Sequence, residues 1–287
     1  MRAAPLLFLL AAWFAAPAWA IPQAIVSAVQ MPGWLTRGEQ TMPLAPGMEV
    51  KNGDVLKTGE GARAYLKLAD GSTVKLGESA RLTFYARSLN PARLFRGALD
   101  VATGAFRFTS DLLRRVQGRD VTIRVGTATI GVRGTDVWGR SNDQDDIVCL
   151  IEGKVEVSHA GDTVALDQPL SFFVAPKGQP AKPVAAVDPA QLAIWAKQTD
   201  IQPGGGAALT DGRWSLLLGR YAGQAEALAV YDRVREAGYP ARIKLTAGES
   251  GDWNYEVRLA GFPTADEASA AARWLKAGTG IDGTPLR

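Results

Sequence analysis

The chain of 287 residues contains one cysteine and one histidine, and its charges nearly balance at a formal net charge of +3. A single cysteine excludes an internal disulfide. The balanced charge is not that of a polybasic nucleic-acid-binding protein. Beyond the first 20 residues, no stretch is apolar enough to span a bilayer. We therefore expect neither nucleic acid nor a transmembrane segment in the mature protein.

The first 20 residues have the three-part layout of a secretory signal. Arg2 supplies a positive start, residues 6–16 are almost continuously apolar, and Ala18-Trp19-Ala20 offers the small residues of a cleavage site. The alternative is an uncleaved anchor, but the run is shorter than the roughly 20 residues that span a bilayer. We predict a signal peptide over residues 1–20 and export to the periplasm.

Residues 21–174 have the pattern of short β-strands. Apolar and polar residues alternate over 63–68 and again over 72–76, and Asp70-Gly71 between them is a strong hairpin signal. Residues 147–151 and 155–157 form a second strand pair that turns at Glu152-Gly153. The pattern predicts an all-β module, either a sandwich or roll or a short β-solenoid.

Residues 175–211 form a predicted linker rich in proline and glycine. Asp188 followed by Pro189 favours a helix start, so we expect a short helix over residues 188–199 that docks on the β module. The glycines at 204–206 are the expected hinge.

Residues 212–287 contain an internal repeat at an offset of 41 positions. Trp214 corresponds to Tyr255, and Tyr221 corresponds to Phe262. Each half has the pattern of a strand, an aromatic turn and a helix. The second predicted helix begins with the capping-box sequence Thr-Ala-Asp-Glu at 264–267. With further strands near 241–245 and 284–286, this predicts an α+β module of the βαββαβ, ferredoxin-like type.

This C-terminal module resembles the SPOR (sporulation-related) family. The similar segments are 214–221 (Trp-Ser-Leu-Leu-Leu-Gly-Arg-Tyr), 237–241 (Ala-Gly-Tyr-Pro-Ala) and 255–262 (Tyr-Glu-Val-Arg-Leu-Ala-Gly-Phe). The resemblance implies binding to peptidoglycan glycan strands that have lost their stem peptides, often with recruitment to division septa. Leu217 and Arg220 depart from the family, where Gln and Ser are usual.

Strand alternation predicts which residues form the open face of this sheet. Leu216, Leu218, Ile243, Leu245, Val257 and Leu259 should point toward the helices. The predicted glycan-binding residues are Ser215, Leu217, Arg220, Tyr221, Arg242, Lys244, Trp253, Glu256 and Arg258, with Tyr221 and Trp253 as an aromatic rim. The cations suit the lactyl carboxylates of the glycan. The alternative is a charged, solvated sheet face without a ligand.

The β module resembles the FecR family across residues 30–170. The similar segments are 53–59 (Gly-Asp-Val-Leu-Lys-Thr-Gly), 68–77, 127–135 with Val-Arg-Gly-Thr, and 148–155 with Glu-Gly-Lys-Val. Well-known members span the membrane and signal to a sigma factor. This chain lacks their cytoplasmic segment and transmembrane helix, so only the exported β domain is implied.

Three further features have a structural and a functional interpretation. Arg133 suits strand cross-linking, for example to Asp136, better than ligand binding. The acidic run at 143–146 lacks the glycine and distal glutamate of a calcium loop, so we expect solvated acids and no metal. The arginines at 107, 114, 115, 119 and 124 are either a basic patch or a solvated edge.

No catalytic constellation is evident. Cys149 lies in an apolar strand, where nothing would lower its pKa, and His159 lies in a turn. Phosphate loops, HExxH and nucleophile elbows do not occur. We expect no enzyme and no cofactor. Two hypotheses remain: a glycan-binding adaptor whose β module docks an envelope protein, and a periplasmic sensor whose β module binds a ligand or a receptor segment.

Overall fold

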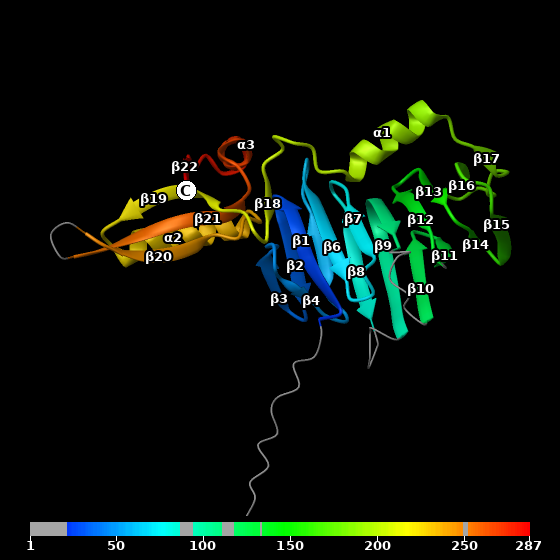
Figure 1. Ribbon diagram of the computed structural model, residues 1–287, viewed down its shortest axis with the longest axis horizontal. Helices are drawn as coiled ribbons and strands as arrows, with labels where there is room; N and C mark the ends of the chain where they lie inside the picture. Colours follow the sequence, from blue (N-terminus) through cyan, green and yellow to red (C-terminus); the bar gives the residue numbers. More distant parts are fainter. Residues whose placement is uncertain (1–21, 87–93, 111–117, 133, 249–251) are drawn as a thin grey trace, which may run out of the picture.

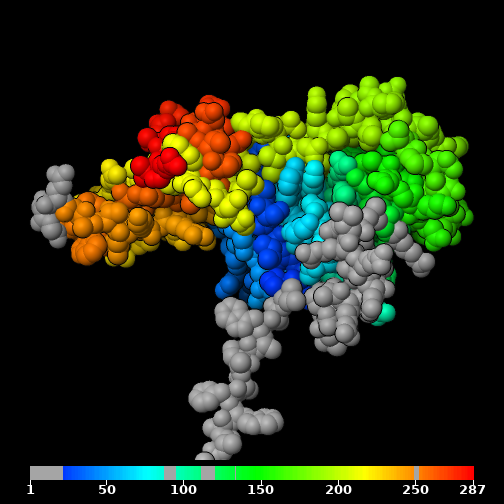
Figure 2. All heavy atoms as spheres, in the orientation of Figure 1, coloured from blue at the N-terminus to red at the C-terminus, as the bar shows by residue number. Residues whose placement is uncertain are grey.

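The computed structural model describes residues 22–86, 94–110, 118–132, 134–248 and 252–287. These residues form an elongated β-sandwich and a smaller α+β unit beside it (Figure 1). The predicted fold class, an all-β module followed by an α+β module, is confirmed. In the space-filling view the α+β unit projects from one end of the sandwich (Figure 2).

The sandwich consists of two sheets that share the long strand β9 (Leu94–Thr109). Sheet A has the order β18 (Ala207–Leu209), β1 (Ala24–Gln30), β6 (Arg63–Leu68), β7 (Thr73–Leu76), β9, β12 (Asp136–Ser141), β13 (Asp145–Glu152), β16 (Ser171–Pro176) and β17 (Ala185–Ala186), with β4 (Glu49–Val50) at the start of β1. Sheet B has the order β3 (Gln40–Pro43), β2 (Gly33–Arg37), β5 (Val55–Thr58), β8 (Arg81–Ala86), β9, β10 (Gly118–Val125), β11 (Ala128–Val132), β14 (Val155–His159) and β15 (Asp162–Leu166).

One hydrophobic core fills the space between the two sheets. Leu66 and Phe106 enter it from sheet A, and Phe84 and Ile123 enter it from sheet B, all fully buried. Alternate residues of each strand supply this core, as the period-2 pattern requires. The structure thus decides for a sandwich over a solenoid.

The predicted hairpin at Asp70-Gly71 is present as β6–β7, but the one at Glu152-Gly153 is wrong. There the chain passes from β13 in sheet A to β14 in sheet B. Gly153 makes the corner at φ 91°, and an added Cβ would lie 2.6 Å from the Gly134 carbonyl oxygen. Only glycine fits this corner without strain.

Helix α1 (Pro189–Thr199) covers the outer face of sheet A, as predicted. Asp188 caps it by accepting a hydrogen bond from the Ala190 amide at 2.6 Å. Trp195 stacks on Trp138 of β12, with ring centroids 4.8 Å apart. The packing of α1 on sheet A buries a second, smaller hydrophobic cluster that includes Cys149.

After α1 the chain returns along sheet A to its first strand, where β18 pairs with β1. The glycines at 204–206, the expected hinge, are held in place. The carboxylate of Glu267 accepts hydrogen bonds from the amides of Gly204 and Gly206, both at 2.6 Å, and of Ala207 at 3.0 Å. Glu267 therefore connects the linker to the α+β unit, instead of closing the predicted capping box.

The α+β unit has the predicted βαββαβ order. Its elements are β19 (Trp214–Tyr221), α2 (Gln224–Glu236), β20 (Arg242–Ala247), β21 (Trp253–Phe262), α3 (Ala265–Thr279) and β22 (Thr284–Leu286), and its sheet order is β20-β21-β19-β22. Thr264 caps α3 by accepting from the Glu267 amide at 3.2 Å, and Gly280 ends it in the left-handed region. Both helices cover one face, and the other face is open.

The two units also meet at the C-terminal end of α2. The Gly33 amide donates to the Gly238 carbonyl at 3.1 Å, and the Trp34 indole donates to the Glu236 carbonyl at 3.2 Å. Helix ends leave carbonyls without partners inside the helix, and here the sandwich supplies the donors. This contact and β18 fix the α+β unit against the edge of the sandwich.

Candidate functional site

The open face of the C-terminal sheet holds two rows of charged residues across its strands. Strand pairing places Leu217, Arg258 and Arg242 in one row. It places Arg220, Glu256 and Lys244 in the next row. Side chains that are paired in this way lie on the same face of a sheet, so four cations surround one carboxylate.

Glu256 is the centre of this face and is only 2% exposed. The Arg220 guanidinium donates to it at 2.7 Å, and Arg258 binds its other carboxylate oxygen. Burial alone would raise the pKa of Glu256, but the hydrogen bonds and charges of the two arginines outweigh it and hold this pKa below its usual value. The prediction that Glu256 is an exposed face residue is therefore wrong; it positions Arg220 and Arg258.

Arg242 and Lys244 on β20 complete the face. Both are exposed, and neither has an ion-pair or hydrogen-bond partner among the described residues. They remain available for an anionic ligand, next to a pair of arginines that Glu256 holds in place. The face therefore has a fixed part and a free part, both positively charged.

A β-bulge in β19 changes which residues reach this face. The pairing with β21 shifts between Leu217 and Gly219, so that Arg220 faces outward and Tyr221 turns to the helix side. Tyr221 packs there against the core, and its hydroxyl lies 2.3 Å from where a Cβ on Gly219 would be. Simple alternation predicts the opposite for both residues, and Tyr221 is not part of an aromatic rim.

Trp253 is also absent from the open face. The pairing of β20 with β21 is regular over its whole length, so Trp253 shares the side of Val257 and Leu259. It is 61% exposed there, and Leu245, predicted to be buried, is 54% exposed. The end of the β20–β21 hairpin extends beyond the helices that would cover it (Figure 1). Leu228 of α2 is also 38% exposed.

Ser215 and Leu217 lie on the open face, as predicted, and both are partly buried. The Ser215 hydroxyl donates to the Leu286 carbonyl at 3.2 Å. Leu217 is flanked by Arg258 on one side and Thr284 on the other. This part of the face is less polar than the row of Arg220 and Lys244.

In the acidic run at 143–146, Asp143 is exposed as predicted, but Asp145 and Asp146 are not solvated acids. Asp146 is fully buried and binds Lys177 at 2.6 Å, Ser141 at 2.7 Å and the Thr127 amide at 2.8 Å. Burial raises the pKa of Asp146, and these hydrogen bonds lower it further than burial raises it. Asp145 pairs with Arg140 at 3.0 Å. These carboxylates cross-link loops of the sandwich, and the described residues contain no cluster suited to a metal ion.

The predicted arginine patch is not formed by its described members. Arg107 lies on sheet A and pairs with Asp136 at 2.7 Å, whereas Arg124 lies on β10 of sheet B and pairs with Asp100. Arg114, Arg115 and Arg133, and the side chain of Arg119, lie outside the described residues. Asp136, the expected partner of Arg133, binds Arg107.

Cys149 and His159 do not form a catalytic pair. Cys149 lies on the outer face of sheet A under α1, and burial raises its pKa to about 12, which opposes thiolate formation. His159 ends β14 in sheet B, beside Phe173 and 3.2 Å from the Thr127 hydroxyl. The buried strand position predicted for Cys149 is confirmed.

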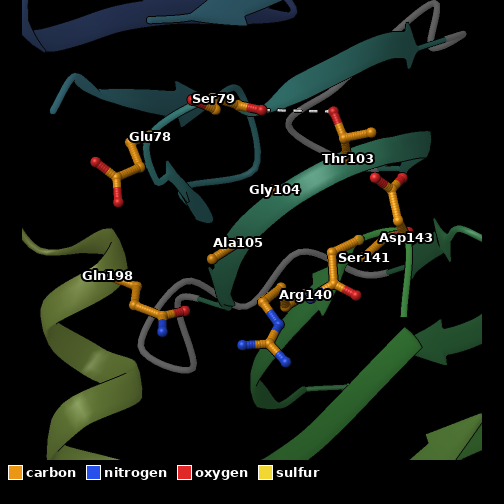
Figure 3. A pocket seen from close by; sticks show the side chains of 10 residues that line it. Glu78, Ser79, Thr103, Gly104, Ala105, Arg140, Ser141, Asp143 and Gln198 are labelled. Carbon is orange, nitrogen blue, oxygen red and sulfur yellow. Dashed lines mark hydrogen bonds between the residues drawn. The ribbon is translucent and has the colours of Figure 1, made fainter. Parts of the chain in front are cut away.

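A polar pocket of about 370 Å³ lies at the C-terminal end of α1, where Gln198 faces two turns of the sandwich (Figure 3). Several of its polar groups already have partners within the sandwich. Thr103 donates to the Ser79 carbonyl at 3.5 Å, and Arg140 is paired with Asp145. We assign no ligand to this pocket.

Two family models match the two domains of the chain, and together they support an envelope protein that is regulatory or peptidoglycan-binding. The FecR protein family model matches residues 54–156, and the SPOR domain model matches residues 210–287. The chain thus carries a FecR domain followed by a SPOR domain, which confirms both resemblances. Both are families of non-catalytic domains that are typically associated with the envelope.

Two crystal structures of a candidate anti-sigma factor from Parabacteroides distasonis are similar to this chain at 16% identity. One covers 79% of this chain and 91% of its own length with a TM-score of 0.42, and the other covers 81% and 98% with a TM-score of 0.41. No curated protein matches the chain. Within the described residues, no helix has the length and apolar character needed to cross a membrane.

Proposed function

We propose that the mature chain is a non-enzymatic periplasmic protein that binds peptidoglycan glycan strands through the open face of its SPOR domain. The observation that carries this proposal is the arrangement of Arg220, Arg258, Arg242 and Lys244 around the buried Glu256. The FecR domain serves as its scaffold and docks an envelope partner. Residues 1–20 are the signal peptide that exports it.

The chemistry of the ligand fits this face. A glycan strand without stem peptides exposes its lactyl carboxylates at regular intervals, and each can accept charge-assisted hydrogen bonds from lysine or arginine. Arg258 and Arg220 are oriented by Glu256, so little of their side-chain entropy is lost on binding. Stem peptides would block access of a flat sheet to the strand.

The SPOR domain is bound to the sandwich through its helices and through β18, which leaves the open face accessible. Glycan binding therefore does not compete with the interface between the domains. A partner of the FecR domain would be held at a fixed place relative to the glycan.

Co-sedimentation of the mature chain with purified sacculi tests the proposal. Pelleting should increase after an amidase removes the stem peptides, and should fall about tenfold in an Arg242→Ala/Lys244→Ala double variant if each lost contact costs about 0.7 kcal/mol or more. These two residues have no partners in the described residues, so the variant should keep its fold.

A matched control removes the same charge elsewhere. Lys57 and Arg81 are exposed neighbours on β5 and β8 of the FecR domain. A Lys57→Ala/Arg81→Ala variant should pellet like the wild type. Equal pelleting of both double variants, or none with amidase-treated sacculi, would contradict glycan binding through this face.

A further inference from the structure

Among the described residues the sandwich has four sheet edges, and three of them are protected. In the described residues, β18 contacts β21 and α3 of the SPOR domain, β3 contacts α2, and β17 is only two residues long. The fourth edge is β15, which pairs with β14 on one side and with no strand of the described part of the chain on the other. Natural sheets rarely leave such an edge unprotected, because its free backbone groups recruit another strand.

The residues of β15 do little to protect this edge. Its sequence Asp-Thr-Val-Ala-Leu has one charge, at the first residue, and no proline. The edge lies at the end of the sandwich opposite the SPOR domain (Figure 1).

A groove of about 590 Å³ borders β15 on the side of Asp162 and Val164. Val157, Val164 and Phe173 line it from the two sheets, and Pro180 and Pro183 line it from the segment after β16. That segment is exposed at every residue from 178 to 186. Its prolines lack a backbone N–H, so it is poorly suited to pair with β15 itself.

The hairpin geometry shows which backbone groups of β15 are free. Ala160 and Gly161 form a two-residue turn with positive φ, so that His159 and Asp162 form a hydrogen-bonded pair. Hydrogen-bonded and non-hydrogen-bonded pairs alternate in an antiparallel ladder. Thr163 and Ala165 therefore direct their N–H and C=O groups away from β14, toward the open edge.

We propose that β15 and this groove form a binding site for an extended segment of a partner protein, which adds to sheet B as a further strand. β15 spans roughly 17 Å at about 3.4 Å per residue, which suits a segment of about five residues. Backbone groups of the segment would pair with Thr163 and Ala165, and apolar side chains at alternate positions would contact Val164 and Phe173. The partner segment must therefore have an extended backbone and apolar side chains at alternate positions.

The test uses the mature chain and a capped synthetic peptide of alternating valine and threonine with a lysine at each end. Titration is followed by amide NMR and hydrogen exchange. We expect protection of the Thr163 and Ala165 amides, and at least tenfold weaker binding by an Ala165→Pro variant. Proline at a free-edge position removes only the outward N–H, so the fold is kept. Ala165→Thr retains the N–H and should bind like the wild type.

A second peptide, N-methylated at alternate residues so that it cannot complete the ladder, should not bind. Equal binding of both peptides, or undiminished binding by folded Ala165→Pro, would overturn the proposal. So would failure of the first peptide to protect either amide at millimolar concentration. Dimerisation that Ala165→Pro abolishes would assign the edge to a second copy of this chain and would also overturn it. None of these results depends on glycan binding.

Discussion

Replacement of Glu267 by alanine should loosen the attachment of the SPOR domain to the sandwich. Its carboxylate accepts hydrogen bonds from three amides of the linker, at 2.6, 2.6 and 3.0 Å. Hydrogen bonds to a charged acceptor stabilise by about 1.5–3 kcal/mol each, and water partly replaces them at a half-buried site. We expect the free energy of unfolding to fall by about 2–4 kcal/mol, which lowers Tm by roughly 5–10 °C for a chain of this size.

Calorimetry of the mature chain, with hydrogen exchange of the amides at 204, 206 and 207, measures this effect. Asp266→Ala is the matched control, because Asp266 precedes Glu267 in the first turn of α3 and is exposed. It should lose only the helix-dipole contribution of about 0.3–1 kcal/mol. If the two variants lose equal stability and equal amide protection, Glu267 does not hold the linker and the reasoning is refuted.

Three further predictions concern stability and reactivity. The pKa of Glu256 is lower in the folded state than in the unfolded state, so its contribution to stability is complete above the unfolded pKa of about 4.3 and is lost as the pH falls through the folded pKa. In urea unfolding, the free energy of unfolding of Glu256→Gln should therefore fall less between neutral and acidic pH than that of the wild type. Trp195→Ala removes a stacked, 7% exposed ring and should cost about 3–5 kcal/mol in a denaturant titration, whereas Trp195→Phe should cost less. Cys149, with a pKa of about 12, should react with a disulfide reagent at neutral pH only as fast as the protein opens, and a stoichiometric burst in the native state would contradict its burial.

Much of the fold could be predicted because local patterns there agree with the final packing. The Asp70-Gly71 turn, the capped helix α1 and the repeated strand–helix units all appear where the sequence indicates them. The predicted hairpin at Gly153 is wrong, because a strand that changes sheet has the same local sequence as one that folds back on its neighbour.

The candidate site was only partly predictable. Alternation correctly places Arg242, Lys244 and Arg258 on one face, because β20 and β21 pair regularly. It fails at Tyr221, because one extra residue in β19 reverses the direction of every side chain that follows. Glu256 binds Arg258, which alternation within β21 places on the same face, and Arg220 of β19, which reaches this face only because of the bulge. The contact with Arg220 therefore does not follow from the spacing within one strand.

By itself, the sequence determined the two families, their order and the secondary structure of each, because these follow from turn residues, periodicity and motifs within short segments. Tertiary structure alone decided how the domains are joined. Glu267 reaches back about 60 residues to the linker, and Trp34 caps a helix 202 residues further along the chain. Such contacts depend on the meeting of separately folded surfaces, so the fixed attachment of the SPOR domain and the open edge at β15 emerge only in three dimensions.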